Sequence, residues 1–156
     1  MADYDGYIGM KKFASDLIKL ANERIDEYTE KAAYIAGVEI QKVARDLSPV
    51  DQGDLRKSIQ VGVSRIGQSI SSVIAPKVKY AAGVEFGQPP GTRVSPAKLA
   101  GWAGRRGLNP YAIAKGIERK GTKAQPFLFP AFDEKQESVF LIISQGIDNA
   151  LNSLGK

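Results

Sequence analysis

At 156 residues, with 43% hydrophobic and 25% charged residues, the chain has the size and composition of one ordinary globular domain. It contains no cysteine and no histidine, which excludes a disulfide framework, a thiolate zinc site and the commonest general base of enzymes. The net charge of +5 serves either solubility through self-repulsion or contact with a polyanion such as DNA.

The N-terminal residues 1–6 are acidic and polar, and lack the basic and apolar regions of a secretory signal. Nowhere does the sequence reach the run of about 18 apolar residues that a membrane span needs. We therefore expect the protein to be cytoplasmic at synthesis, with no membrane partner. No cofactor is expected.

The segment from Gly9 to Leu47 is predicted to form one long helix. Its apolar residues recur mostly at steps of three and four, which places them on one face: they are Phe13, Leu17, Leu20, Ile25, Tyr28, Ala32, Ile35, Val43 and Leu47. Gly37 is expected to weaken or bend the helix, at about 1 kcal/mol relative to Ala. A helix of this length needs an extended partner, either a sheet face with another helix or a neighbouring subunit.

A turn is predicted directly after this helix. Pro49 cannot continue a helix, Asp51 can accept a hydrogen bond from a backbone N–H two residues on, and Gly53 supplies free dihedral angles. Leu55 then returns to the core, so Pro49, Asp51, Gly53 and Leu55 are interpreted as structural turn residues.

An antiparallel hairpin is predicted next. Apolar and polar residues alternate over 59–64 and again over 70–75, which is typical of half-buried strands. Gly67 and Gln68 form the expected turn between them, and Pro76 ends the second strand.

The segment from Tyr80 to Phe86 is predicted to be a helical turn that leads into an extended stretch. It contains one carboxylate, Glu85, in an apolar setting, where the side chain must point outwards or find a cation. Residues 87–91 form a loop. They lack the Gly-Lys-Ser/Thr ending of a phosphate loop, so nucleotide binding has little support.

Residues 88–123 are predicted to be a basic insertion of two short helices, because Ser95-Pro96 and Asn109-Pro110 each place a capping residue before a first-turn proline. Trp102 is expected to anchor a small satellite core or to serve an interface. The insertion holds eight basic residues against one acid, Glu118; the eight are Arg93, Lys98, Arg105, Arg106, Lys115, Arg119, Lys120 and Lys123.

The last part of the chain is predicted to be an extended segment over Gln125–Phe129 followed by a helix to the C-terminus. Pro130 suits the helix start, with Asp133 and Glu134 in the first turn. An apolar stripe continues from Phe132 to Leu154. Together, the elements predict an α+β fold: a single domain, 1–156, with two long helices on a small antiparallel sheet and the insertion 88–123.

No constellation for catalysis is evident in the sequence. Asp51 and Asp54 lie across a turn with no further carboxylate nearby, so turn hydrogen bonding accounts for them better than a metal site. Arg105 and Arg106, between two glycines, fit either a phosphate contact or a solvated loop.

Three runs, in this order, resemble one known family: SPVDQGDLRKSI (48–59), KYAAGVEFG (79–87) and GTKAQPFLFPAF (121–132). The family is that of the tail-component, or neck and tail-completion, proteins of long-tailed bacteriophages. The resemblance implies a non-enzymatic virion protein that forms a ring, expected to be six-fold, between the head connector and the tail tube, with DNA passing through it.

The resemblance also favours a structural or inter-subunit ion pair for Glu85, with Arg56 or Lys57 as partner. The interface candidates are then Glu85, Trp102, Arg105, Arg106, Lys115, Arg119, Lys120 and Lys123. The alternative interpretation is a small basic nucleic-acid-binding module, which a steep salt dependence of DNA binding would distinguish.

Overall fold

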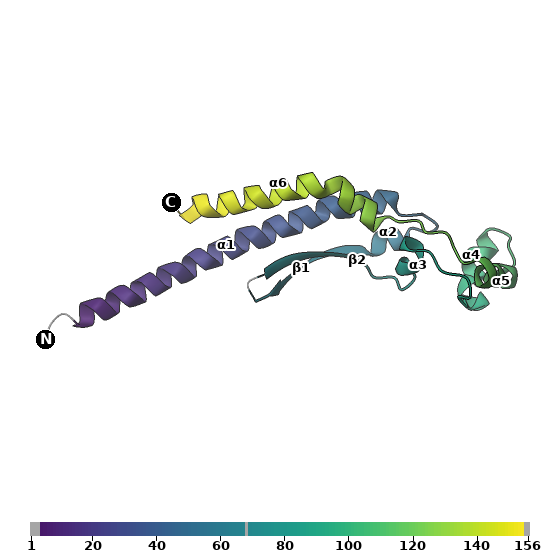
Figure 1. The fold of residues 1–156 in the computed structure, drawn as a ribbon, viewed down its shortest axis with the longest axis horizontal. Coiled ribbons are helices and arrows are strands. Elements are labelled where there is room, and N and C mark those ends of the chain that lie inside the picture. Colours follow the sequence, from purple (N-terminus) through teal and green to yellow (C-terminus); the bar gives the residue numbers. More distant parts are fainter. Residues whose placement is uncertain (1–3, 68, 155–156) are drawn as a thin grey trace. The chain divides into compact units, whose positions relative to one another are not determined.

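The structure is a computed structural model that describes residues 4–67 and 69–154, with the backbone alone for residues 4–9. The described residues form an α+β fold, as predicted, with two long helices, four short ones and a two-stranded antiparallel sheet (Figure 1). In chain order the elements are α1 (Tyr4–Leu47), α2 (Asp54–Ser58), β1 (Ile59–Ile66), β2 (Ser69–Pro76), α3 (Ala81–Glu85), α4 (Pro96–Arg105), α5 (Pro110–Lys120) and α6 (Leu128–Leu154).

The chain divides into two compact units. The first consists of Met1–Glu39, Val61–Val73 and Gln136–Lys156, and the second of Ile40–Gln60 and Ile74–Lys135. The organisation as one domain therefore stays a prediction, and each unit is described by itself.

In the first unit, α1 packs between the hairpin and α6 (Figure 1). A Cβ atom on Gly37 would lie 2.6 Å from Cγ1 of Val61 and would also meet Oγ of Ser72. On the α6 side, a Cβ on Gly146 would meet Cβ of Ala32. Gly37 thus permits a close approach of α1 to the sheet, a role that its expected effect on helix stability did not indicate.

The hairpin alternates as predicted. Val61 and Val63 of β1, and Ile70 and Ser72 of β2, are half-buried, while their neighbours point to solvent. The expected turn begins at Gly67, whose φ of 62° favours glycine; Gln68 lies outside the described residues.

The buried face of α1 differs from the predicted stripe. Its buried side chains are mostly small, namely Ala32, Ala33, Ala36 and, in the second unit, Ile40 and Ala44. Large members of the stripe are exposed instead, with Phe13 at 66%, Leu17 at 50% and Leu20 at 57%. The reason is steric, because a helix that lies close against both a sheet and a second helix must present small side chains to them.

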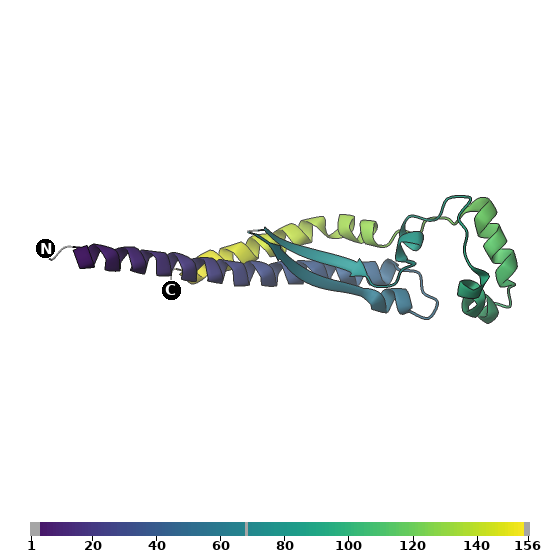
Figure 2. The same ribbon diagram turned by 90° about the horizontal axis from the view of Figure 1, so that it is seen from below.

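In the second unit, Figure 2 shows α4 and α5 side by side, and these two helices pack against each other. The N–H of Tyr111 donates to the Asn109 side chain over 2.9 Å at the start of α5, whereas Ser95 makes no side-chain capping bond at the start of α4. Gly121 ends α5 with φ at 72°. Within the expected loop 87–91, Gln88 pairs with Thr122 in an antiparallel bridge, so this loop is partly ordered by β-type bonds.

The start of α6 corrects the prediction. The helix begins at Leu128, so Pro130 is its third residue and no acid lies in its first turn. Asp133 and Glu134 therefore fall beyond the position where they would interact best with the helix dipole. That position is served by a residue of α3, described below.

Candidate functional site

The turn after α1 is fixed by backbone geometry and by arginine. Gly53 adopts φ of 81° and ψ of 7°, a left-handed conformation, and its carbonyl accepts from the N–H of Lys57 over 2.9 Å. The Nε of Arg56 donates to the carbonyl of Arg45 over 2.7 Å. Leu55, with 4% of its surface exposed, points into the core of the second unit.

Asp51 has a different partner from the one expected. Its Oδ1 accepts from Nη1 of Arg106 over 2.8 Å, and its Oδ2 from Nη2 of Arg105. The two arginine bonds, first that of Arg105 and then that of Arg106, lower the pKa of the Asp51 carboxyl below its ordinary value. Asp51 therefore joins the turn to the end of α4, instead of bonding a backbone N–H two residues on.

Trp102 completes this cluster. The guanidinium of Arg106 lies 4.5 Å from the centroid of the Trp102 ring, a cation–π arrangement. Arg105 and Arg106 thus lie together at Asp51, and Trp102 joins them through its contact with Arg106. The arginine side chains of the cluster are about two-fifths exposed, so the cluster can both fix α4 to the turn and present a surface to a partner.

Glu85 is 4% exposed and caps α6 from outside that helix. Its Oε2 accepts from the N–H groups of Phe127 over 2.8 Å and Leu128 over 3.0 Å, and its Oε1 accepts from that of Phe129 over 3.0 Å. The first N–H groups of a helix have no partner within it. Glu85 supplies that partner, together with a negative charge at the positive end of the helix dipole.

The structural ion pair expected within the chain between Glu85 and Arg56 or Lys57 is therefore wrong, while the inter-subunit pair stays a prediction. Glu85 bonds backbone N–H groups, and Arg56 donates to the carbonyls of Arg45 and Asp46. The sequence offered no local signal for this cap, since Glu85 lies 42 positions before its first partner, Phe127.

Aromatic side chains lie exposed beside this cap. The rings of Phe86 and Phe129 meet edge to face with centroids 6.0 Å apart, and they are 68% and 61% exposed. Tyr80 directly precedes α3 and is 52% exposed. The partial burial of its side chain, followed by the charges of Asp54 and Asp51, raises the pKa of its hydroxyl.

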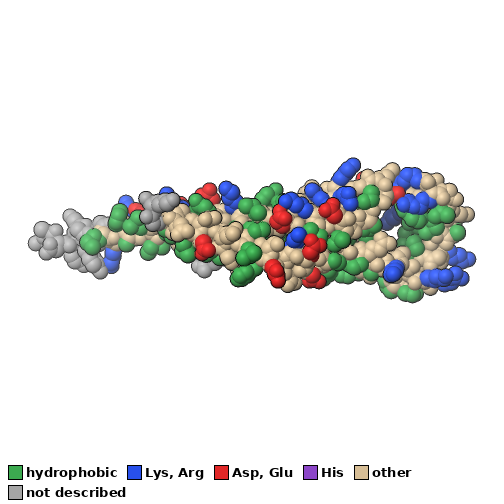
Figure 3. All heavy atoms as spheres, turned by 90° about the horizontal axis from the view of Figure 1, so that it is seen from above, with side chains coloured by type: hydrophobic (Ala, Val, Ile, Leu, Met, Phe, Trp, Pro, Cys, Tyr) green, Lys and Arg blue, Asp and Glu red, His purple; other side chains and the backbone are tan. Residues whose placement is uncertain are grey.

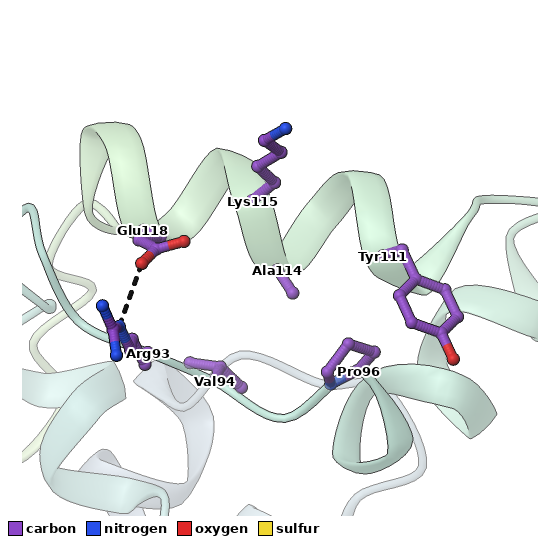
Figure 4. A pocket seen from close by; sticks show the side chains of 7 residues that line it. All are labelled: Arg93, Val94, Pro96, Tyr111, Ala114, Lys115 and Glu118. Atoms are coloured by element: carbon purple, nitrogen blue, oxygen red, sulfur yellow. Dashed lines mark hydrogen bonds and ion pairs between the residues drawn. The ribbon is translucent and has the colours of Figure 1, made fainter.

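A shallow hollow of about 330 Å³ lies between the segment before α4 and helix α5 (Figure 4). Arg93 and Glu118 point toward each other at its edge and form an ion pair of 3.1 Å, while Lys115 points away from it. The paired charges leave a lining of mixed polarity that includes Val94 and Pro96. Among the described residues that line this hollow, there is neither a nucleophile–base pair nor a set of metal ligands.

Basic side chains cover the same region. Figure 3 shows Lys and Arg side chains over α4 and α5. The predicted candidates Lys115, Arg119, Lys120 and Lys123 are all exposed. Within residues 4–67 and 69–154 there is no group of three or more His, Cys, Asp or Glu side chains suited to a metal ion. No helix in that part of the chain is long and apolar enough to cross a membrane.

These observations define an α+β protein with a long N-terminal helix and a basic two-helix insertion. Residues 11–87 match the family described as "Bacteriophage HK97-gp10, putative tail-component". This match confirms the resemblance seen in the sequence over that part of the chain, which is similar to a phage tail-component family. Comparison with curated proteins and with solved structures gives no match.

The matched range runs through α1, α2, the hairpin and α3. It includes the first two of the resembling runs, up to Gly87, and ends before the insertion and α6. The family supports a tail-related structural component of a virion, which interacts with other virion proteins.

Proposed function

We propose that this protein is a subunit of a ring at the phage head–tail junction, where it completes the tail or joins it to the head connector. The ring, six-fold by resemblance, contacts the tail tube on one side and the connector on the other, and DNA passes through it. Its role is structural and needs no catalytic group. The match of residues 11–87 to a tail-component family carries the proposal.

The distribution of apolar side chains supports assembly. Among the described residues, only Phe127 and Ile59 are large side chains that are fully buried. Large apolar residues are exposed on both long helices and beside α3, for example Phe13 at 66%, Phe86 at 68% and Phe140 at 71%. Scattered exposed residues are normal, but contiguous ones typically mark surfaces that a partner covers.

The basic insertion supports contact with an acidic neighbour. Its eight basic residues and one acid give 88–123 a charge of +7, against +5 for the whole chain, so the remainder carries −2. Charge confined to one surface is better explained by a partner than by solubility, which any surface could serve. The partner is the face of a neighbouring ring protein or the passing DNA, reached through Lys115, Arg119, Lys120 and Lys123.

Electron microscopy tests the proposal. Particles from a phage whose copy of this gene carries a nonsense codon should show filled heads and separate tails, and the purified protein should restore joined particles. Antibody against the protein should label the junction. Normal joined particles in the mutant, or label along the tail shaft alone, would contradict the neck location.

A second candidate, a basic nucleic-acid-binding module, is favoured by the same charged insertion. Its signature is tight DNA binding by the monomer with a steep salt dependence, because each neutralised phosphate contributes about −0.9 to the slope of log K against log salt. Weak binding with a shallow slope leaves the ring as the better interpretation.

A further inference from the structure

The N-terminal part of α1 buries none of its side chains from residue 10 to residue 20, because every one of them is exposed. Further along, Nη1 of Arg24 donates to the carbonyl of Ser153, near the end of α6, over 2.8 Å, and α1 continues past this point (Figure 1). Most of the stability of a helix in a protein comes from the packing of an apolar face, and residues 10–20 bury none within the described part of the chain. We therefore expect a surface from outside the chain to cover it.

The spacing of its apolar side chains indicates what covers it. Met10, Phe13, Leu17 and Leu20 follow steps of three, four and three, which is the seam of a helix that packs on another helix. They are 73%, 66%, 50% and 57% exposed. The partner surface is then an apolar stripe on a helix.

Helix α6 carries such a stripe. Phe140, Ile147, Leu151 and Leu154 follow steps of seven, four and three, and are 71%, 43%, 56% and 42% exposed. Phe140 and Leu151 lie on the side of α6 away from Gly146, which packs at Ala32. Ile147 and Leu154 stand three and four positions from the buried Ala150, so they border the packed face and are only partly open. The stripe is thus open at Phe140 and Leu151 while α6 is packed on its own α1.

The charges of the two segments are complementary. Residues 10–20 hold three lysines and one aspartate, a net charge of +2. Residues 136–154 hold Glu137 and Asp148 and no basic residue, a net charge of −2. Opposite net charges on packed helices favour this pairing over like with like.

We infer that the stripe Met10–Phe13–Leu17–Leu20 of one copy docks on the stripe Phe140–Ile147–Leu151–Leu154 of the next copy. The two surfaces are different, so the contact is heterologous, and such contacts close into rings when their rotation permits. The inference rests on the proposed ring and names the helices that hold it together.

Cysteine cross-linking tests the contact directly, because the chain has no cysteine of its own. Leu17→Cys on one copy and Ile147→Cys on another should form a disulfide when mixed and oxidised. Within one copy they cannot react: Gly146 packs at Ala32, and Leu17 lies about 22 Å further along α1, beyond the reach of a disulfide. Ser15→Cys, on the opposite side of α1, is the matched control and should not cross-link to Ile147→Cys.

A charge placed in the seam gives an independent readout. Leu17→Glu should raise the concentration for half-assembly roughly tenfold or more, since it removes one large apolar contact. Asn22→Glu adds the same charge on the outer side of the helix and should assemble like the parent. Circular dichroism of both variants checks that the helix content is retained.

The outcomes separate this contact from the ring itself. If the parent forms rings, the 17–147 disulfide is absent and Leu17→Glu assembles normally, this inference is overturned and the ring stands. If the Leu17→Cys variant instead cross-links to another virion protein, that protein and not a second copy covers the stripe on α1. If Leu17→Glu loses only the binding of the protein to anionic vesicles, a lipid surface covers it instead. If the parent stays monomeric and is missing from particles, the proposed function fails with it.

Discussion

Replacing Glu85 by Gln should destabilise the start of α6 more than any other single acid-to-amide change in the second unit. The carboxylate is 4% exposed and accepts three backbone N–H bonds, at 2.8, 3.0 and 3.0 Å. A hydrogen bond to a charged group contributes about 1.5–3 kcal/mol. Gln keeps one acceptor oxygen but turns an N–H₂ donor toward backbone donors and loses the charge at the helix dipole, so we expect a loss of about 2–3 kcal/mol.

Hydrogen exchange at the amides of Leu128 and Phe129 measures this loss locally, without assuming two-state unfolding. A loss of about 2–3 kcal/mol corresponds to protection lowered by about 30- to 150-fold. Glu134→Gln is the control, because its carboxylate is 56% exposed and pairs with the neighbouring Lys135 at the surface; it should change stability by less than about 0.5 kcal/mol. Protection within about threefold of the parent in Glu85→Gln would refute the capping role.

Three further substitutions follow from the backbone geometry and the charges. Gly37→Ala should destabilise the protein by about 1–3 kcal/mol in urea unfolding, because the added Cβ would overlap side chains of the sheet. The control Gly116→Ala lies in open space on α5 and should stabilise the protein by about 0.5–1 kcal/mol. Equal effects of the two substitutions would contradict the close approach of α1 to the sheet. Gly53→Val should lower the free energy of unfolding by roughly 1–3 kcal/mol, because valine is strained at a φ of 81°. The control Gly62→Val, in β1, should leave stability unchanged or raise it. The same melting temperature for both variants would count against backbone strain at Gly53. The Asp51→Asn variant should be less stable than the parent at pH 7, and the stabilities of the two should converge in acid. The pKa of the Asp51 carboxyl in the folded protein lies below the ordinary value of 3.8. The stabilisation from its ion pairs is therefore present above pH 3.8 and is lost as the pH falls through the lowered pKa. A difference that persists when the carboxyl is fully protonated would show that the ion pairs are not its source.

Local chemistry was predictable from the sequence. The breaks at Pro49 and Pro76, the alternation of the strands and the capping of α5 by Asn109 each depend on residues within a few positions of one another. Proline and glycine restrict or free the backbone wherever they stand, and a period of two identifies a half-buried strand. Such signals need no knowledge of the tertiary fold.

The start of α6 and the buried face of α1 were not predictable in the same way. Pro130 marks a helix start only when the capping group is local, and here Glu85 of α3 caps the helix from 42 positions away. On α1, periodicity found the apolar residues but not which of them face inward. That choice depends on how closely the partners approach, and the close contacts at Gly37 and Ala32 select small side chains for burial.

The basic insertion shows how tertiary pairing changes an electrostatic argument. Counted in sequence, 88–123 offers eight positive groups, but Arg93 is paired with Glu118, and Arg105 and Arg106 are paired with Asp51, which lies outside the insertion. An acidic partner that binds this arginine pair must therefore compete with Asp51 for guanidinium groups that already have a carboxylate. Partner contact should then depend first on the lysines and Arg119 of α5 and its following segment.

Removing the Asp51 carboxylate should strengthen, rather than weaken, the attraction of this surface for polyanions, because it frees two charges that the fold otherwise uses. Asp51→Asn should therefore leave a heparin column at higher salt than the parent does. Asp46→Asn removes the same charge elsewhere, so it controls for the change in net charge alone. Equal elution of the two variants would show that the arginine pair is as available in the parent as it is without Asp51, and the competition argued here would then be wrong.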